Sequence, residues 1–383
     1  MNTTPPAASS KPGLAVTLAR WGLVLLLLYG FLIAIHLMGG SIKSLGKDAA
    51  KDLFDGIKNP FAGLSVGILA TVLVQSSSTT TSTIVGLVGA AKSVALPLTT
   101  AVPMIMGANI GTTITNTIVS IGHIRQGPEF RRAFAAATVH DFFNLLTVAL
   151  LLPVEMATGV LERTATSLTK LFVTETTHGN FDSPIKTAVK TASKGLEKGL
   201  AALGLEGIPL TVVMLVVGIA LTFICLVFIT KNMRVLISGP LERAMNRTLG
   251  KSGLAGILVG MVVTIAVQSS SITTSLLVPM CAAGVLTLAN AFPIMLGANI
   301  GTTVTGILAS QAAETSAGLT IALVHLLFNL VGVAIFFPIP AVRRIPIRLA
   351  EGLAARAQRS SLWVVAYVLG VFVILPLVGY LLF

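Results

Sequence analysis

The sequence predicts an all-α polytopic membrane protein built from two copies of one hydrophobic unit. Hydrophobic residues make up 54% of the chain and charged residues 10%, whereas soluble domains carry roughly 25% charged residues. Mean hydropathy is +0.91. Several apolar runs reach the about 20 residues that a helix needs to cross a bilayer. These runs are Leu18–Met38, Ala133–Pro153, Ile208–Thr230, Thr320–Pro338 and Leu362–Leu382.

Three pairs of motifs reveal the duplication. Each first copy returns downstream at an offset of 193, 190 or 185 residues, as expected if a few loop residues were lost between two copies of one unit. The pairs are TVLVQSSSTTTSTI at 71–84 with TIAVQSSSITTSLL at 264–277, MIMGANIGTTIT at 104–115 with IMLGANIGTTVT at 294–305, and VHDFFN (His140, Asn144) with VHLLFN (His325, Asn329).

The motifs and apolar runs divide the chain into seven segments. The first long run has no clear cleavage site after it and is too long for a signal peptide, so we interpret it as a retained helix. The segments are 1–17, a disordered tail; 18–59, the first transmembrane helix and a linker; 60–153, repeat one; 154–207, an extracellular loop; 208–252, a transmembrane helix and a basic cytoplasmic loop; 253–340, repeat two; and 341–383, a basic segment and the last transmembrane helix.

The distribution of the net charge of +12 predicts the topology. Segments 231–251 and 343–359 each hold five Lys/Arg against one acid, whereas 155–206 holds six against six. The positive-inside rule places the two basic segments in the cytoplasm. Because the cations flank apolar spans, a nucleic-acid partner is not expected. With the N-terminus inside, the two repeats begin on opposite sides, as in inverted-repeat transporters. The same count places the C-terminus outside.

In each copy, a Gly, a Thr and the Gln that opens the QSSS motif are spaced four residues apart. This spacing puts the three side chains on one helix face, and the small residues permit close helix packing. Three serines and another short apolar run come next. We interpret each segment as a re-entrant hairpin of two half-helices with the serines near its tip. GANIGTT predicts a further helix break, since Gly adopts unusual backbone angles. The spaced residues are Gly67, Thr71 and Gln75, and Gly260, Thr264 and Gln268.

A broken membrane helix leaves free backbone N–H groups at the start of its second half, and these attract anions. The serine hydroxyls would add donors at the same place. The alternative is that the hydroxyls bond back to their own helix, but the repetition in two matching contexts favours a functional role, as intramembrane polar clusters usually have. The predicted oxyanion ligands are Ser76, Ser77, Ser78, Ser269, Ser270, Ser271, Asn109 and Asn299.

Amide, hydroxyl and carboxylate oxygens in the same segments suit a hard cation such as Na⁺. No Lys or Arg lies in either QSSS or GANIGTT motif, so co-bound cations would have to supply the positive charge, and each ion would then strengthen binding of the other. No cofactor is expected apart from Na⁺ as coupling ion. Its predicted ligands are Gln75, Gln268, Thr112, Thr115, Thr302, Thr305, Asp141 and Asn144.

Asp141 breaks the symmetry of the repeats, because Leu326 occupies its place in the second copy. A carboxylate in an apolar helix should bind a cation, be protonated or reach water; a structural hydrogen bond is the alternative. For His140 and Asn144, hydrogen bonding between helices is as plausible as ligand binding, and His140 could also carry a proton. Cys225 and Cys281 are expected to be small buried hydrophobes.

These motifs resemble the type II sodium–phosphate cotransporter family over most of 60–340. TNTIVSI at 115–121, EFRRAFAAATVHDFFN at 129–144 and LLPVE at 151–155 add to the resemblance. It implies uptake of inorganic phosphate driven by the Na⁺ gradient, with the loop between the repeats outside. It also implies that both termini lie inside, and there we follow the family rather than the charge count.

The resemblance also bears on charge movement and origin. A family Asp matching Asp141 marks members that move net charge, so electrogenic transport is expected. The loop at 155–206 contains no Cys, unlike the vertebrate members. The short tails and compact loop resemble a bacterial member, which would reside in the cell inner membrane.

The predicted function is sodium-coupled symport of inorganic phosphate into the cell. The partners are phosphate, Na⁺ and membrane lipid, with no obligate protein partner. One alternative is symport of another small oxyanion such as sulfate, and another is a phosphate-sensing membrane component. An enzyme is disfavoured, because the serines lack a nearby His–acid arrangement and no nucleotide-binding loop is present.

Overall fold

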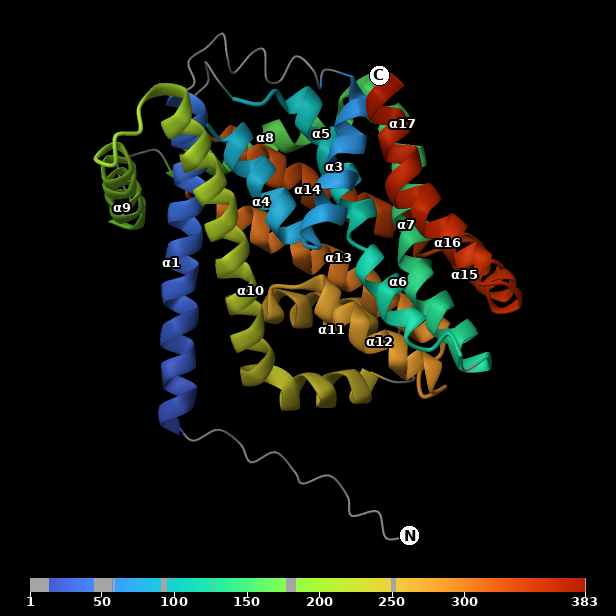
Figure 1. Cartoon of the computed structure of the whole chain (residues 1–383). Helices are drawn as coiled ribbons and strands as arrows, with labels where there is room; N and C mark the ends of the chain where they lie inside the picture. The colour runs from blue at the N-terminus through green and yellow to red at the C-terminus, as the bar shows by residue number, and fades with distance from the viewer. Residues whose placement is uncertain are drawn as a thin grey trace.

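The computed structural model describes residues 14–44, 57, 59–90, 95–125, 127–176, 184–248 and 253–382. Within these ranges the regular structure is entirely helical (Figure 1). Parts of the predicted tail and linker, 1–13 and 45–56, lie outside the described residues. The helices are α1 (Leu14–Ser44), α3 (Pro60–Val74), α4 (Ser77–Val88), α5 (Leu98–Gly111), α6 (Ile114–Ile121), α7 (Pro128–Thr158), α8 (Val160–Thr176), α9 (Pro184–Ala201), α10 (Gly207–Thr248), α11 (Gly253–Val267), α12 (Ser270–Ala282), α13 (Leu288–Ser310), α14 (Ala317–Phe336), α15 (Pro340–Arg359), α16 (Leu362–Leu369), the π-helix η1 (Gly370–Ile374) and α17 (Leu375–Leu382).

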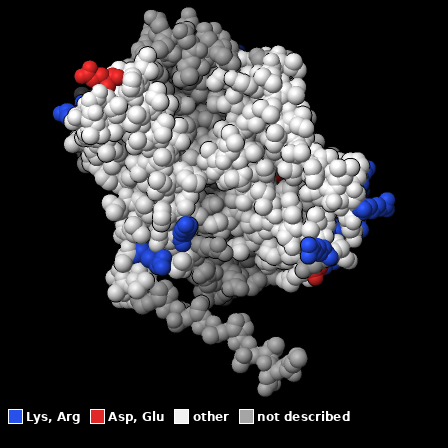
Figure 2. All heavy atoms as spheres, in the orientation of Figure 1, with Lys and Arg blue, Asp and Glu red and all other residues white. Residues whose placement is uncertain are grey.

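Six segments in the described part of the chain are long and apolar enough to cross a membrane. This confirms the prediction of an all-α polytopic membrane protein. In the view of Figure 2, charged side chains lie toward the edges of the surface, and the broad area between them is almost uncharged. The six segments are Leu14–Ser41, Pro128–Thr158, Gly207–Met233, Leu288–Ser310, Ala317–Phe336 and Leu362–Leu382.

The first helix begins earlier than the sequence indicated. The sequence predicts a disordered tail that ends at residue 17, but α1 starts at Leu14. It packs antiparallel to α10 at one edge of the molecule (Figure 1). Near the start of α1, the Arg20 guanidinium donates to Asn232 Oδ1 at 2.9 Å. Near its other end, the backbone of Gly218 lies against Met38.

The two copies build the same packing unit from parallel helices, α3 with α5 and α11 with α13. The contacts depend on glycine, because a methyl group added at any of four positions would collide with a backbone carbonyl of the facing helix. Small residues let two helix backbones approach closely in a membrane, as the spacing of Gly67 and Gly260 indicated. The four positions are Gly67 and Gly107 in the first unit, and Gly260 and Gly297 in the second.

The prediction that GANIGTT breaks a helix in both copies is wrong for the second copy. In the first motif the helix is interrupted at Thr112 and Thr113, between α5 and α6, but α13 runs unbroken through the second motif. No glycine of either motif has a positive φ. These glycines therefore serve close packing against α3 and α11 rather than unusual backbone angles.

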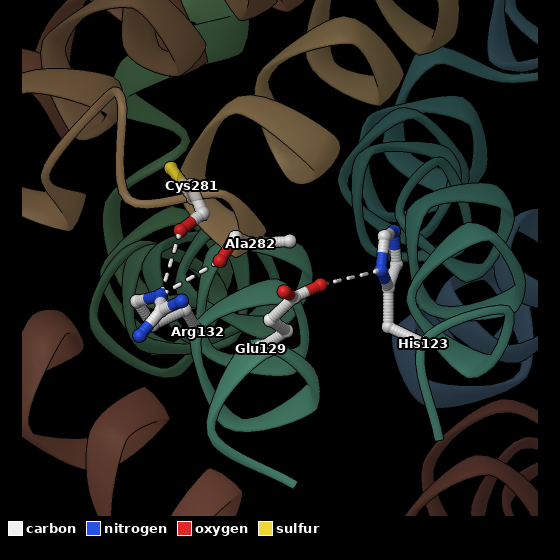
Figure 3. A network of polar contacts seen from close by, with 5 residues as sticks. All are labelled: His123, Glu129, Arg132, Cys281 and Ala282. Carbon is white, nitrogen blue, oxygen red and sulfur yellow. Dashed lines mark hydrogen bonds and ion pairs between the residues drawn. The ribbon is translucent and has the colours of Figure 1, made fainter. Parts of the chain in front are cut away.

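Each end of helix α7 lies near a different QSSS segment. Near its start, Arg132 Nε donates to the carbonyls of Cys281 at 3.2 Å and Ala282 at 2.8 Å (Figure 3). A cation there suits the exposed carbonyls at the C-terminal end of α12. Just beyond the other end of α7, Gly159 shares a pocket with Pro60, the first residue of α3. The open ends of the α3–α4 and α11–α12 pairs thus lie at opposite ends of α7.

The two ends of the described chain also lie at opposite ends of the molecule (Figure 1). Helix α17 finishes beside α3, where Gly379 approaches Ser65, whereas α1 begins at the far end. The family resemblance implies instead that both termini lie on one side of the membrane, and this remains a prediction. The arrangement agrees with the charge count. Its physical cause is the last segment, α16 to α17, which returns along the molecule after α15.

Candidate functional site

Both QSSS motifs fold into the same strained break between two helices. Gln75 closes α3 with a φ of 56°, and Gln268 closes α11 with a φ of 57°. Among the described residues, these are the only two non-glycine residues with positive φ. Such conformations cost free energy and cluster at functional sites. The next residue caps the second helix: Ser76 Oγ accepts from Thr79 N at 3.2 Å, and Ser269 Oγ accepts from Ile272 N at 3.4 Å.

The two breaks meet at one pocket with a volume of about 360 Å³. Helices α4 and α12 both begin at this pocket, so their unpaired N-terminal N–H groups and positive dipole ends converge on it. Helix α10 forms the remaining wall. The polar residues lining the pocket are Gln75, Ser76, Ser77, Ser78, Gln268, Ser269, Ser270, Ser271, Thr230 and Lys231.

The serines of each triplet differ in their bonding. Ser76 and Ser269 are engaged as helix caps, and Ser76 Oγ also accepts from Thr79 Oγ1 at 2.9 Å. The second and third hydroxyls of each triplet form no side-chain hydrogen bond with any other described residue. Three of these four residues, Ser77, Ser78 and Ser270, are each 6% exposed or less. Their hydroxyls are therefore available to a ligand in the pocket.

Lys231 is a pocket residue that the motif analysis missed. It extends from α10, and its Nζ lies 5.3 Å from the ring centroid of Phe228. The sequence signal was present only as one cation in a basic segment, where it counted toward topology. The fold brings it beside the two serine triplets, which carry no fixed charge of their own.

Each break-forming glutamine is held by a threonine two residues after the matching GANIGTT motif. Thr115 Oγ1 donates to Gln75 Oε1 at 3.2 Å, and Thr305 Oγ1 donates to Gln268 Oε1 at 3.0 Å. The glutamine side chains are further fixed because each Nε2 donates to its own helix. These two amide–hydroxyl pairs place oxygen atoms at the edge of the pocket.

The other two predicted threonine ligands bond to their own helices. Thr112 Oγ1 donates to Ala108 O at 2.9 Å, and Thr302 Oγ1 donates to Ala298 O at 3.0 Å. This is the structural alternative for hydroxyls in membrane helices. Neither residue is among those that line the pocket.

Asn109 and Asn299 lie in a buried cluster that joins the repeats, outside the pocket lining. Each asparagine faces the histidine of the opposite copy: His140 Nε2 lies 2.5 Å from Asn299 Oδ1, and His325 Nε2 lies 3.3 Å from Asn109 Oδ1. Asn144 completes the cluster, since it donates to Asn109 O at 2.8 Å and accepts from Asn299 Nδ2 at 2.9 Å. These contacts are the hydrogen bonds between helices that the sequence left as an alternative to ligand binding.

Asp141 is fully buried and is bonded by a residue far away in the chain. Tyr367 Oη donates to Asp141 Oδ2 at 2.7 Å. The other carboxylate oxygen, Oδ1, is buried without a hydrogen-bond partner of standard geometry in the described part of the chain, and the Thr113 side chain lies close to the carboxylate. The sequence carried no signal for Tyr367, because it lies in an apolar run 226 residues away.

A second pocket of about 440 Å³ lies where α7, α8 and the start of α3 meet. Glu155 closes it by accepting from Leu161 N at 2.7 Å and Glu162 N at 3.0 Å at the start of α8. Burial, and then the nearby Glu155, raise the pKa of Glu162, while Arg163 opposes the shift. Because Glu155 is engaged as a helix cap, we assign this region a structural role.

Comparison with known proteins identifies the family. The sequence profile described as Na⁺/Pi-cotransporter matches residues 30–173 and 211–348. The chain is 33% identical over 445 residues to sodium-dependent phosphate transport protein 2A of Ovis aries, covering 96% of this chain and 69% of that protein. It is 33% identical over 446 residues to protein 2B of Homo sapiens, covering 93% of this chain and 64% of that protein. No solved structure gives a significant match.

The chain therefore belongs to the Na⁺/Pi-cotransporter family, and it is a multi-pass membrane protein. The family assignment agrees with the resemblance drawn from the QSSS and GANIGTT motifs.

Proposed function

We propose that this protein is a sodium-coupled symporter that carries inorganic phosphate into the cell. The observation that carries the proposal is the single pocket on which both QSSS breaks converge. Two helix N-termini and several free hydroxyls supply donors all around a tetrahedral oxyanion. The names of the relatives, sodium-dependent phosphate transport proteins 2A and 2B, support phosphate as that anion.

The direct phosphate ligands are the serine hydroxyls without other partners, together with the N–H groups at the starts of α4 and α12. Ser76 and Ser269 keep these helices open toward the pocket by capping them. Asn109 and Asn299 stabilise the interface between the repeats that presents the two tips. The ligands with free hydroxyls are Ser77, Ser78, Ser270 and Ser271.

Sodium binds to the oxygens that border this pocket and to Asp141. The Gln75–Thr115 and Gln268–Thr305 pairs each offer an amide and a hydroxyl oxygen, which hard cations prefer. Divalent phosphate is neutralised by two Na⁺ ions, and a further Na⁺ at Asp141 makes the cargo positive. Transport is therefore electrogenic.

The two repeats have inverted topology, and each QSSS segment is a re-entrant hairpin. The end of α12 and the start of α3 lie at opposite ends of α7, which supports this arrangement. Phosphate and Na⁺ then bind between the hairpin tips, and access alternates as one repeat moves against the other. A bacterial inner membrane would present the basic 343–359 segment to the cytoplasm.

Uptake of labelled phosphate into proteoliposomes tests the proposal. An inward Na⁺ gradient should drive accumulation, and an equal K⁺ gradient should not. Excess unlabelled sulfate should leave uptake unchanged. Competition by sulfate equal to that by phosphate would favour the wider oxyanion symporter, and the absence of Na⁺-dependent accumulation would reject the symport proposal.

The electrogenic step has its own test. Each charge that crosses the full field gains about 2.3 kcal/mol per 100 mV, so an inside-negative potential should stimulate uptake by the wild type. Asp141→Asn keeps the shape of the side chain and removes its charge. We expect this variant to retain Na⁺-dependent uptake without voltage stimulation. Equal stimulation of variant and wild type would remove Asp141 from the charge-carrying site.

A further inference from the structure

We propose that Tyr367 is a positioning residue for the cation site at Asp141, so that the last membrane segment takes part in sodium coupling. The inference rests on the proposed function. It extends that function to a segment outside both repeats and beyond residue 348, where the match to the family profile ends.

The carboxylate of Asp141 has two different oxygens. Oδ2 accepts from Tyr367 Oη at 2.7 Å, while Oδ1 is buried and has no hydrogen-bond partner of standard geometry among the described residues; the Thr113 side chain also lies close to the carboxylate. A hydrogen bond to a charged group is among the stronger kinds in proteins. By fixing Oδ2, the phenol sets the rotation of the carboxylate and leaves Oδ1 as the oxygen free for a cation.

An aromatic cluster holds the Tyr367 ring in place. Its centroid lies 6.3 Å from Phe134 in an edge contact at 81°, 6.1 Å from Phe142, and 6.0 Å from Phe372 in an edge contact at 89°. Edge-to-face pairs of this kind are favourable arrangements of aromatic rings. Tyr367 is thus anchored to α7, which carries Asp141, and the hydroxyl needs no reorganisation to reach the carboxylate.

A π-helix begins soon after Tyr367 and interrupts the last segment at Gly370–Ile374. Such interruptions inside α-helices occur frequently at functional sites. Here the π-helix carries Phe372, which packs on the tyrosine ring. The π-helix and the hydrogen bond to Asp141 therefore both fix the position of Tyr367. A helix that only packs against lipid needs neither feature.

The test compares Tyr367→Phe with Tyr380→Phe in proteoliposomes. The first change keeps the ring and removes the hydroxyl at Asp141; the second removes a hydroxyl from a 46% exposed tyrosine of the same segment. We expect Tyr367→Phe to raise the half-saturating Na⁺ concentration roughly tenfold, the order expected for loss of a hydrogen bond to a charged group. The half-saturating phosphate concentration at saturating Na⁺ should stay within about twofold, because Tyr367 does not line the pocket.

A double variant separates positioning from a general structural role. In the Asp141→Asn background, Tyr367→Phe should have no further effect on the half-saturating Na⁺ concentration, since its action passes through the carboxylate. An additive effect of the two changes would overturn the inference. So would wild-type Na⁺ dependence of Tyr367→Phe in a protein that does transport phosphate, a result that leaves the proposed function intact.

A binding measurement covers the case in which Tyr367→Phe is inserted poorly into liposomes. Na⁺ raises the unfolding temperature of a protein that binds it in the folded state. In detergent, titration with NaCl against KCl should stabilise the wild type and Tyr380→Phe at lower salt than Tyr367→Phe. Identical titration curves for all three proteins would refute the positioning role.

Discussion

Replacing one serine at a time separates the two roles that the structure gives to each triplet. Ser77 and Ser270 have free hydroxyls at the pocket, whereas Ser76 and Ser269 cap the helices that begin there. We expect Ser77→Ala or Ser270→Ala to weaken phosphate binding and to leave the fold intact. A hydrogen bond to a charged ligand contributes about 1.5–3 kcal/mol. At about 1.4 kcal/mol per factor of ten, the half-saturating phosphate concentration should rise roughly 10- to 150-fold.

Replacing a capping serine should mainly lower the stability of the fold, whereas replacing a pocket serine should mainly lower phosphate affinity. Loss of a serine cap costs a helix about 0.5–2 kcal/mol, so Ser76→Ala should lower the unfolding temperature in detergent more than Ser77→Ala does. Ser82→Ala is the matched control: this serine is fully buried in the same helix and is not among the pocket residues. Its phosphate affinity should equal that of the wild type.

The assay is phosphate-dependent uptake at saturating Na⁺, with protein content matched between the liposome preparations. Unchanged half-saturating phosphate concentrations in both Ser77→Ala and Ser270→Ala would refute the assignment of these hydroxyls as ligands. An increase of the same size in Ser82→Ala would show that any change in α4 disturbs transport, which contradicts a specific role for the pocket hydroxyls.

Lys231→Gln should raise the half-saturating phosphate concentration by no more than about fivefold, because exposed charges contribute little and are screened by salt. Lys198→Gln is the control, since Lys198 is not among the pocket residues. An equal effect of the two changes, or an effect of Lys231→Gln that added KCl does not reduce, would contradict a role for Lys231 at the pocket. Topology can be mapped with an impermeant thiol reagent after replacement of the two buried native cysteines. The reagent should label Leu382→Cys and Leu203→Cys from one side of the membrane and Arg359→Cys from the other. Labelling of Leu382→Cys and Arg359→Cys from the same side would contradict the arrangement of α16 to α17.

The repeated local features could be read from the sequence because their physics is local. A Gly, a Thr and a Gln four residues apart define one helix face, and three serines at its end can cap a new helix. The breaks at Gln75 and Gln268 follow from this pattern. The GANIGTT prediction failed in the second copy because glycine in a membrane helix has two uses, and close packing at Gly297 needs an ordinary helical backbone.

The residues missed from the sequence depend on long-range placement. Nothing near Lys231 or Tyr367 distinguishes these residues from a topology charge and an aromatic residue in a membrane helix. Their roles depend on α10 lying against the hairpin tips and on α16 lying against α7. Likewise, the exchange of partners between His140–Asn299 and His325–Asn109 is invisible in a sequence that places each His and Asn within its own repeat.

The division between repeated and unrepeated residues gives the site its chemistry. The repeats supply matching neutral donors and acceptors at the two tips, so either copy can face a small oxyanion in the same way. Charge enters only through residues that have no counterpart: Asp141 faces Leu326 across the symmetry, and Lys231 lies outside both repeats, as does the neutral Tyr367 that bonds Asp141. A site made only of the duplicated residues could bind an anion with its cations but would have no fixed charge to set how many cations accompany it. On this reasoning the duplicated residues determine what is bound, and the unpaired residues determine the charge that moves with it.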